Sequence, residues 1–362
     1  MGVPETMRAV VLAGHGGIEM LRFEPAWPVP ALGPHDVLVE VGACAVNATD
    51  VNTRVGWYAA GDDNGAWDEP IRFPRIQGAD VCGRIAAIGA TAGSAPAVGR
   101  RVMIDPWVRD PDRPDDLGRC RYLGSELDGG YAEYVAVPAA NAHLVESPLS
   151  DAELASFATS YGTALNLVRR ASVQPGDDVL VTGASGGVGA ALVQLVRLAG
   201  ARPIAVCHPD KADAVRDLGA AFTLDRDGDL RDGLRRAIGR TSVRRVIDVV
   251  GGPQWSRLLD VLDRGGTYAV AGAIAGPHVS LDLRTLYLND LTFVGVAVMP
   301  PGLFADLVGL VERGEIRPVV AATFPFDAAA EAQEVFTRKQ HIGKIVLRGW
   351  NRAAASSPEA WS

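Results

Sequence analysis

The sequence predicts an α/β fold with a doubly wound, parallel sheet. Short apolar runs, typical of buried strands, alternate with helical patterns from residue 178 to residue 271, and a glycine-rich turn joins the first strand to the first helix. Strands that alternate with helices form parallel sheets covered by helices on both faces. The regions before and after this alternation are richer in strand-like patterns, which indicates a second, mostly β domain.

The N-terminal region supports that second domain. Strand-like runs at Arg8–Leu12 and Val37–Val41 flank a stretch rich in proline, which favours turns and edge positions. Further short strands are expected at Gly83–Ile88, Arg101–Ile104 and Tyr131–Val137. Between them, the polar segment Asp105–Asp128 is typical of a surface loop.

A helical pattern over Ser150–Arg170 opens the second domain. Ser150 is a favourable N-cap residue, and Glu153 three positions later completes a capping box. The α/β alternation then follows, with strands at Val179–Val181, Pro203–Cys207, Arg245–Val250 and Thr267–Ala271, and helices from Val188, at Ala212–Leu218 and at Trp255–Leu262.

The C-terminal part continues with four elements and a tail. We expect a strand at Leu291–Val298, helices at Leu303–Glu312 and Ala328–Thr337, and a closing strand at Lys344–Leu347. The tail, residues 349–362, is rich in alanine and serine and is expected to be disordered.

The glycine-rich turn indicates a dinucleotide site. Its glycines, Gly183, Gly186, Gly187 and Gly189, permit a tight bend and a close approach of backbone to a pyrophosphate at the helix N-terminus. Glycines also make tight turns for structural reasons alone, but their place between a buried strand and an amphipathic helix is the context that dinucleotide binding requires.

Composition excludes several other functions. The 362 residues carry a formal net charge of -8, and their paired arginines are scattered, so we expect no nucleic-acid partner. No apolar run approaches the roughly 20 residues that span a bilayer, and Met1–Met7 lacks the order of a signal peptide. The 4 cysteines show no paired spacing. We therefore expect a cytoplasmic protein with reduced thiols and no membrane segment.

Several motifs together resemble one family. They are Val41–Asp50, Thr53–Tyr58, Pro74–Gly83, Gly129–Glu133, Val181–Gly189, Asp248–Gly252, Gly314–Pro318 and Gly343–Leu347. Over about residues 7–348 the chain resembles the medium-chain dehydrogenases/reductases, in their zinc-independent branch near the quinone oxidoreductases. The resemblance implies a Rossmann domain, residues 150–301, inserted into a GroES-like catalytic domain, residues 1–149 and 302–348.

The chain departs from the zinc-dependent alcohol dehydrogenases at their metal ligands. Where that family has a cysteine and a histidine, this sequence has Asn47 and Ala79, and Cys44 lies three residues too early. Asparagine and alanine cannot supply the preorganised ligands of a catalytic zinc. The structural zinc lobe is also missing, since Asp105–Asp128 contains only Cys120. We therefore expect no zinc.

Without zinc, hydrogen bonds must stabilise the negative charge that develops during the reaction. Reduction of a quinone, an enone or another activated double bond suits this condition. Two alternatives stay open: a specialised biosynthetic reductase of an imine, iminium or carbonyl intermediate, and a dinucleotide-binding sensor without catalysis. Which substrate is used cannot be read from the sequence.

Four residues are the catalytic candidates. The resemblance places Asn47 near the nicotinamide ribose and the substrate carbonyl, although it is also a turn asparagine that can satisfy backbone groups. Tyr58 is a candidate proton donor or only a pocket-shaping aromatic residue. Arg54 either steadies Asp50 or a polar substrate, or forms a surface ion pair.

The cofactor candidates lie in the second domain. By resemblance, Thr163 contacts the nicotinamide, and its alternative is a helix threonine bonded to its own backbone. The other candidates are at the glycine turn or at strand ends: Gly183, Ser185, Gly186, Gly187, Val188, Val250, Gly251, Ala271, Gly272 and Ala273.

The end of the second strand favours NADPH over NADH. No acid follows Cys207 at the place where NAD enzymes bind the ribose 2′-hydroxyl. His208 and Lys211 stand there instead, suited to a 2′-phosphate, although Asp210 adds negative charge and Lys211 has the alternative of a solvated helix residue. The family resemblance also implies a homodimer, paired through the apolar edge strand Leu291–Val298.

Overall fold

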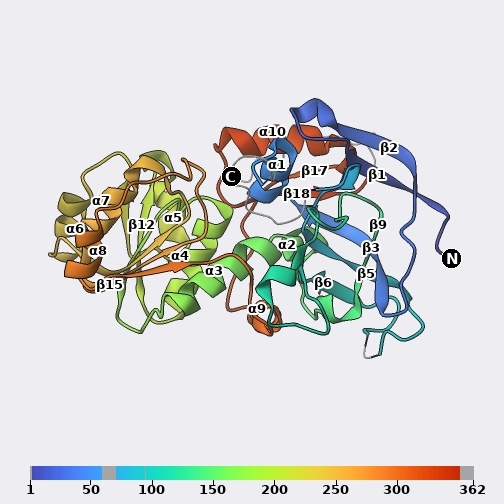
Figure 1. Cartoon of the computed structure of the whole chain (residues 1–362), viewed down its shortest axis with the longest axis horizontal. Coiled ribbons are helices and arrows are strands. Elements are labelled where there is room, and N and C mark those ends of the chain that lie inside the picture. The colour runs from blue at the N-terminus through green and yellow to red at the C-terminus, as the bar shows by residue number, and fades with distance from the viewer. Residues whose placement is uncertain (1, 59–70, 94, 351–362) are drawn as a thin grey trace. The chain divides into compact units, whose positions relative to one another are not determined.

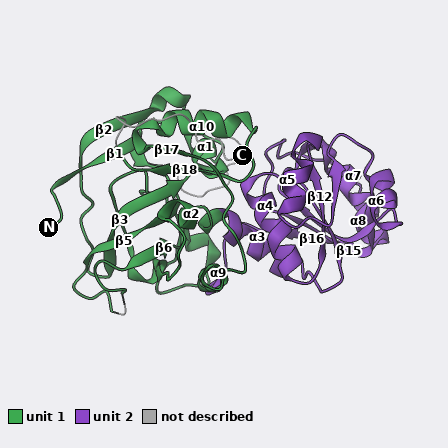
Figure 2. Cartoon of the chain, turned by 180° about the vertical axis from the view of Figure 1, so that it is seen from behind, with its two compact units in different colours: residues 1–159, 304–362 green, residues 160–303 purple. Residues whose placement is uncertain are grey.

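The computed structural model describes residues 2–58, 71–93 and 95–350. The chain forms two compact units, coloured separately in Figure 2. Unit 1 comprises Met1–Thr159 and Phe304–Ser362, and unit 2 comprises Ser160–Leu303. The predicted tail lies outside the described residues from residue 351 onward.

Unit 1 is built on strands from both ends of the chain (Figure 1). Its larger sheet has the order β10-β6-β5-β3-β18-β17, and β9 also pairs with β3. These strands are β3 (Asp36–Ala45), β5 (Asp80–Ile88), β6 (Arg101–Ile104), β9 (Tyr134–Pro138), β10 (Ala142–Leu144), β17 (Val320–Phe324) and β18 (Lys344–Arg348). A smaller sheet, β2-β1-β4, contains β1 (Thr6–Leu12), β2 (Leu21–Pro28) and β4 (Arg75–Ile76).

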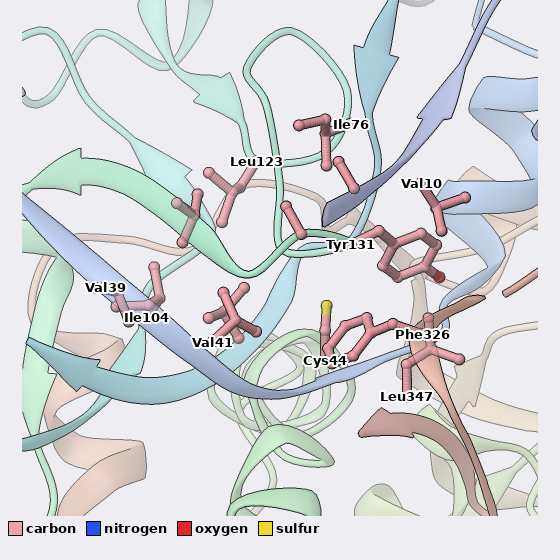
Figure 3. Close-up of a cluster of buried hydrophobic side chains, with 14 of the residues drawn as sticks. Val10, Val39, Val41, Cys44, Ile76, Ile104, Leu123, Tyr131, Phe326 and Leu347 are labelled. Carbon is pink, nitrogen blue, oxygen red and sulfur yellow. The ribbon is translucent and has the colours of Figure 1, made fainter. Parts of the chain in front are cut away.

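The helices of unit 1 are short, and its core lies between strands. The helices are α1 (Ala48–Val55), α2 (Asp151–Ala155), α9 (Leu303–Glu312) and α10 (Ala329–Arg338). Figure 3 shows part of the core, where Tyr131, Cys44, Phe326 and Leu347 gather with valines of β3. All four of those side chains are completely buried. The C-terminal end of β3 is therefore anchored in the apolar core.

Unit 2 contains the predicted parallel sheet. Its strand order, β13-β12-β11-β14-β15-β16, is the 3-2-1-4-5-6 arrangement of a Rossmann domain. The strands are β11 (Asp178–Val181), β12 (Arg202–Cys207), β13 (Phe222–Asp225), β14 (Val243–Asp248), β15 (Leu262–Val270) and β16 (Thr292–Gly295). Helices α3 (Ala158–Arg170), α4 (Gly187–Leu198), α5 (Ala212–Asp217), α6 (Leu230–Ile238), α7 (Trp255–Leu259) and α8 (Leu283–Leu288) accompany them (Figure 1).

The structure corrects two predicted elements. The single helix over Ser150–Arg170 is two helices, α2 and α3. Where α2 ends, the Glu153 carbonyl oxygen accepts from both the hydroxyl (2.6 Å) and the backbone N–H (3.1 Å) of Ser156. The Phe157 N–H donates to the Leu154 carbonyl oxygen, so the helical hydrogen-bond pattern is interrupted. The capping box at Ser150 and Glu153 is present as predicted.

The predicted surface loop Asp105–Asp128 is partly ordered and buried. Trp107–Val108 (β7) pairs antiparallel with Arg121–Tyr122 (β8), and the rings of Trp107 and Tyr122 lie 4.7 Å apart. The polar residues between these strands suggested a surface loop. The contact between the aromatic rings of β7 and β8 holds the two ends of this segment together as a hairpin.

Candidate active site

Three neighbouring strands bring their ends together at one edge of the large sheet in unit 1. β3 runs antiparallel to both β5 and β18, and its residue Ala45 pairs with Asp80 on one side and Val346 on the other. The C-terminal end of β3 therefore lies beside the first residues of both neighbours. As a result, Asn47, Asp80 and Lys344 are next to one another.

The three side chains form a buried polar cluster. The Lys344 ammonium donates to Asn47 Oδ1 over 2.5 Å and to Asp80 Oδ2 over 3.0 Å. The other carboxylate oxygen of Asp80 accepts from the Thr159 backbone N–H over 2.7 Å. Lys344 is only 2% exposed and Asp80 is fully buried, so the two charges compensate each other away from water.

Asp50 lies on the other side of Asn47 and has donors of its own. Its carboxylate accepts from the Asn47 backbone N–H over 2.7 Å, from the Gly78 N–H over 3.1 Å and from the Tyr131 hydroxyl over 3.2 Å. Burial raises the pKa of Asp50 to about 6, although the Asn47 N–H and the Lys344 charge act to lower it. Asp50 therefore fixes the first turn of α1, and its pKa lies above that of an ordinary aspartate.

Gly78 allows this close packing. Its φ angle is +100°, and a Cβ there would lie 2.5 Å from the ring of Tyr131 and 2.7 Å from Cys44 Sγ. A side chain at position 78 would displace the hydroxyl that Asp50 accepts from.

Arg54 is held in a hydrogen-bond chain inside unit 1. Its Nε donates to Gln333 Oε1, Gln333 Nε2 donates to Gln77 Oε1, each over 2.9 Å, and Gln77 Nε2 donates to the Asp50 carbonyl oxygen over 2.6 Å. The side chain is buried, so through this chain Arg54 links α1 to α10.

Tyr58 follows α1 directly and is half-buried. Its hydroxyl accepts a hydrogen bond from Asn52 Nδ2 over 3.1 Å, and burial raises its pKa. Tyr58 belongs to the segment Trp57–Phe73, of which residues 59–70 lie outside the part that the structure describes.

In unit 2 the backbone of the glycine turn is closely packed between β11 and α4. Gly183 has a φ angle of +57°, and a Cβ on Gly189 would lie 2.1 Å from the Gly183 carbonyl oxygen. α4 starts at Gly187 with Gly186 as its N-cap, so its first N–H groups have no partner within the helix. The bare backbone and these donors fit a dinucleotide pyrophosphate.

Asp248, at the end of β14, organises the strand ends beside the turn. It accepts from the hydroxyls of Thr182 (2.5 Å) and Tyr268 (2.6 Å), and from the backbone N–H groups of Val250 and Gly251. These bonds fix the loops that follow β11 and β14 at the carboxyl edge of the sheet.

Most of the predicted cofactor residues lie at that edge. Gly183, Ser185, Gly186, Gly187 and Val188 form the turn after β11, which pairs with β14. Val250 and Gly251 follow β14, and Ala271, Gly272 and Ala273 follow β15. A Cβ on Gly251 would lie 3.0 Å from Ala273 Cα, so the two later loops touch.

His208 and Lys211 follow β12, the next strand along. His208 Nδ1 accepts from the Asp210 N–H over 3.3 Å. The Arg226 N–H donates to the Cys207 carbonyl oxygen over 3.1 Å, which brings a second cation to this strand end. Burial lowers the pKa of Lys211, and the charge of Arg226 lowers it further. The guanidinium of Arg226 also lies 3.4 Å from Asp227.

Thr163 lies on α3, apart from the strand ends in sequence. Its neighbours fix this helix: Tyr161 accepts from Gln194 Nε2 of α4 over 2.8 Å, and a Cβ on Gly162 would lie 2.4 Å from Met299 Sδ. α3 is therefore packed against α4 and the segment that follows β16.

The residues at the zinc positions do not fit a catalytic zinc. Asn47 already turns its only ligand oxygen toward an ammonium, and Ala79 has no ligand atom. Cys44 is fully buried in the core, where its Sγ packs against Gly78. Among the described residues, no three His, Cys, Asp or Glu side chains are grouped closely enough to hold a metal ion.

Comparison with known proteins identifies the family. Residues 33–148 match the alcohol dehydrogenase GroES-like domain, and residues 187–313 match the family described as zinc-binding dehydrogenase. The structure of a putative alcohol dehydrogenase from Sinorhizobium meliloti 1021 is 43% identical, with a TM-score of 0.89 over 96% of this chain and 98% of its own. The chain belongs to the medium-chain dehydrogenase/reductase superfamily. It is an oxidoreductase, as are the relatives named quinone oxidoreductase and alcohol dehydrogenase, and its fold of a Rossmann domain with a GroES-like domain is the one predicted.

Two further proteins resemble this chain over most of its length. The quinone oxidoreductase of Lama guanicoe is 28% identical over 351 residues, which cover 94% of this chain and 97% of that protein. A 2-octenoyl-CoA carboxylase reductase, solved with NADP and 2-octenoyl-CoA, is 27% identical with a TM-score of 0.84, over 96% of this chain and 88% of its own. The zinc positions 47 and 79 lie outside the part that matches the zinc-binding dehydrogenase family.

Sequence reasoning missed several residues of these clusters. Lys344 and Asp80 each stood inside a quoted motif without a role. Asp248 opens a recognised motif, yet its many partners are visible only in the fold. Arg226 has no sequence signal beyond its place after a strand. Separately, none of the helices that the structure describes is long and apolar enough to cross a membrane.

Proposed function

We propose that this protein is a zinc-independent, NADPH-dependent oxidoreductase that transfers hydride to a quinone, an enone or another activated double bond. The observation that carries the proposal is the replacement of both zinc-ligand positions, by an amide that faces an ammonium and by Ala79. Relatives named quinone oxidoreductase support this reaction class.

The proposed chemistry requires hydrogen-bond donors instead of a Lewis acid. A nicotinamide cofactor supplies hydride when bound. The acceptor's carbonyl oxygen then gains negative charge, which the Nδ2 group of Asn47 stabilises as a donor. Tyr58 keeps its proton to high pH, because burial raises its pKa, and is the candidate proton donor.

A panel of substrates tests the reaction. Loss of NADPH absorbance is followed with quinones, enones, imines and simple ketones. We expect turnover with quinones or enones, and at least about a hundredfold lower kcat in Asn47→Ala, the usual cost of losing one such donor. Turnover of imines alone would favour the biosynthetic alternative, and NADPH binding without any turnover would favour a sensor.

The preference for NADPH is proposed from the cations after β12. Lys211 and Arg226 flank the place where the ribose lies in the family, and the solved carboxylase reductase carries NADP. Fluorescence titration should show NADPH binding at least about tenfold tighter than NADH, or ~1.4 kcal/mol.

Removing the charges of Lys211 and Arg226 makes the cofactor titration more specific. Lys211→Ala and Arg226→Ala should each weaken NADPH binding and leave NADH binding unchanged. Arg264→Ala is the matched control, because this 71% exposed cation lies near the start of β15, at the opposite edge of the sheet. Equal effects on both cofactors would contradict the proposed 2′-phosphate site.

We also propose a homodimer that forms through the β16 edge of unit 2. β16 is the last strand of its sheet, and apolar side chains near it are exposed, among them Leu283 (65%) and Tyr287 (62%). Light scattering should give twice 38.1 kDa, and Leu283→Glu should shift the mass toward the monomer. A monomeric wild type would refute the proposal.

Finally, we propose a cytoplasmic location. The four cysteines are free, buried thiols, which suits a reducing compartment. Cell fractionation with an antibody to the chain tests this.

A further inference from the structure

Lys344 is the cation that the chain places beside its candidate catalytic amide. Its Nζ lies 2.5 Å from Asn47 Oδ1 and 3.0 Å from Asp80 Oδ2, and all three side chains are at most 5% exposed. The Asp50 carboxylate is not a competing partner for the amide, because it accepts from backbone N–H groups and from Tyr131. The Asp50 backbone N–H faces the Asn47 side chain in a capping box, which also directs a donor toward the amide oxygen. The ammonium therefore acts on Asn47 in a dry environment, where electrostatic effects are strong.

The contact fixes which way the carboxamide faces. An ammonium has only donors, so the amide must turn its oxygen toward Lys344 and its Nδ2 group away. Among the described residues, Nδ2 donates to one acceptor, the Ala45 carbonyl oxygen, over a long 3.4 Å. At least one N–H of Asn47 is thus available for a ligand.

The contact also changes the strength of that donor. A positive charge at the amide oxygen draws electron density from the nitrogen, so its N–H bonds become more acidic and donate more strongly. Asp80 pairs with the same ammonium and accepts a second hydrogen bond from Thr159, so it reduces this effect. The ammonium is nevertheless the charge that bonds directly to the amide oxygen.

We propose that Lys344 is a positioning residue that orients and polarises the Asn47 carboxamide, so that its N–H group binds the developing oxyanion of the substrate as a charge-assisted donor. The proposal rests on the proposed function, in which Asn47 is that donor. The buried ammonium then performs, through an amide, the stabilisation of negative charge that a zinc ion performs in metal-dependent relatives of the superfamily.

A double-mutant cycle tests the coupling. Lys344→Met with Asp80→Asn removes both charges and leaves no unpaired buried carboxylate. We expect kcat to fall about tenfold, the difference between a charge-assisted and a neutral hydrogen bond, while the Kd for NADPH changes less than about twofold. In an Asn47→Ala background the same pair of substitutions should lower kcat by less than about twofold.

Two comparisons and one control decide the result. An equal loss in both backgrounds would overturn the proposal, because it would mean that Lys344 acts by holding the fold. Lys344→Arg keeps the charge and should recover part of kcat where Lys344→Met does not. Circular dichroism melts are run on every variant, so that kcat is compared only at temperatures where all of them are folded.

A structural measurement separates this inference from the proposed function. In NMR spectra, the side-chain amide resonances of Asn47 should move in the Lys344→Met/Asp80→Asn variant by more than those of other buried asparagines such as Asn166. Unmoved Asn47 resonances would overturn the inference even in an active enzyme. A wild type that turns over no substrate would contradict the proposed function, while the resonances still decide whether Lys344 polarises Asn47.

Discussion

The two units build their polar sites in opposite ways. In unit 2, Asp248 and the glycine turn arrange backbone groups, and several of the partners are close in sequence, such as Gly251, three residues from Asp248. In unit 1, Asn47 and Lys344 are side chains separated by 297 positions. The site in unit 2 therefore rests partly on contacts within single segments, whereas the contact between Asn47 and Lys344 in unit 1 exists only after the sheet has formed.

The largest expected effect tests the role of backbone packing in unit 2. Gly189→Ala would put a Cβ 2.1 Å from the Gly183 carbonyl oxygen, which neither backbone can avoid without opening the turn. We expect a loss of about 3 kcal/mol or more in the free energy of unfolding, measured by urea denaturation.

Gly186→Ala is the matched control for that variant. Its Cβ would lie 3.4 Å from the same oxygen, at an ordinary φ of -77°, so we expect a loss below about 1 kcal/mol. Equal losses in the two variants would show that the turn is not fixed by this contact.

The second prediction tests buried charge in unit 1. Burial raises the pKa of Asp50 from 3.8 to about 6. A carboxyl that binds its proton more tightly when folded contributes stability that is fully present below pH 3.8 and is lost as the pH rises through about 6. The loss over this window is on the order of 3 kcal/mol.

Chemical denaturation at several pH values measures the slope of the free energy of unfolding against pH. Asp105 has its pKa raised to about 6 by burial as well, so it adds a slope of the same sign. Asp50→Asn and Asp105→Asn should each remove part of the slope. A wild-type slope that Asp50→Asn leaves unchanged would contradict the assigned titration of Asp50.

The sequence predicted many helices and strands of both units, but it missed others, among them α1, α6, α8 and β17. Five of the six parallel strands of unit 2 were predicted from apolar runs, and β13 was missed because it has too few apolar residues. In unit 1, β2 was missed, because its prolines suggested turns although they lie in a strand at the edge of the small sheet. Such edge positions do not need every N–H group to be paired.

The candidate site was predictable only where one segment carries the chemistry. Asn47 and the glycine turn were found from local motifs and from the family resemblance. The partners of Asn47 depend on the register of β3 with β5 and β18, which pairs Ala45 with Asp80 and Val346. No periodicity within one segment specifies that register, so Lys344 stayed without a role.

The smallest expected effect compares helix starts in the two units. Ser150→Ala removes the N-cap that accepts from the Glu153 N–H in unit 1, and Asp229→Ala removes the one that accepts from the Asp232 N–H in unit 2. Each should cost about 1 kcal/mol of unfolding free energy. A much larger loss for one of them would show that its helix also supports packing elsewhere.

The pairing of β18 with β3 makes the order of synthesis matter. A ribosome completes Asn47 and Asp80 long before it adds Lys344, so the growing chain holds an amide without its cation and a carboxylate without its counter-ion. Only β18 supplies both. The polar cluster of unit 1 can therefore form only after β18 has been synthesised, and a chain that stops before residue 344 has no means of forming it.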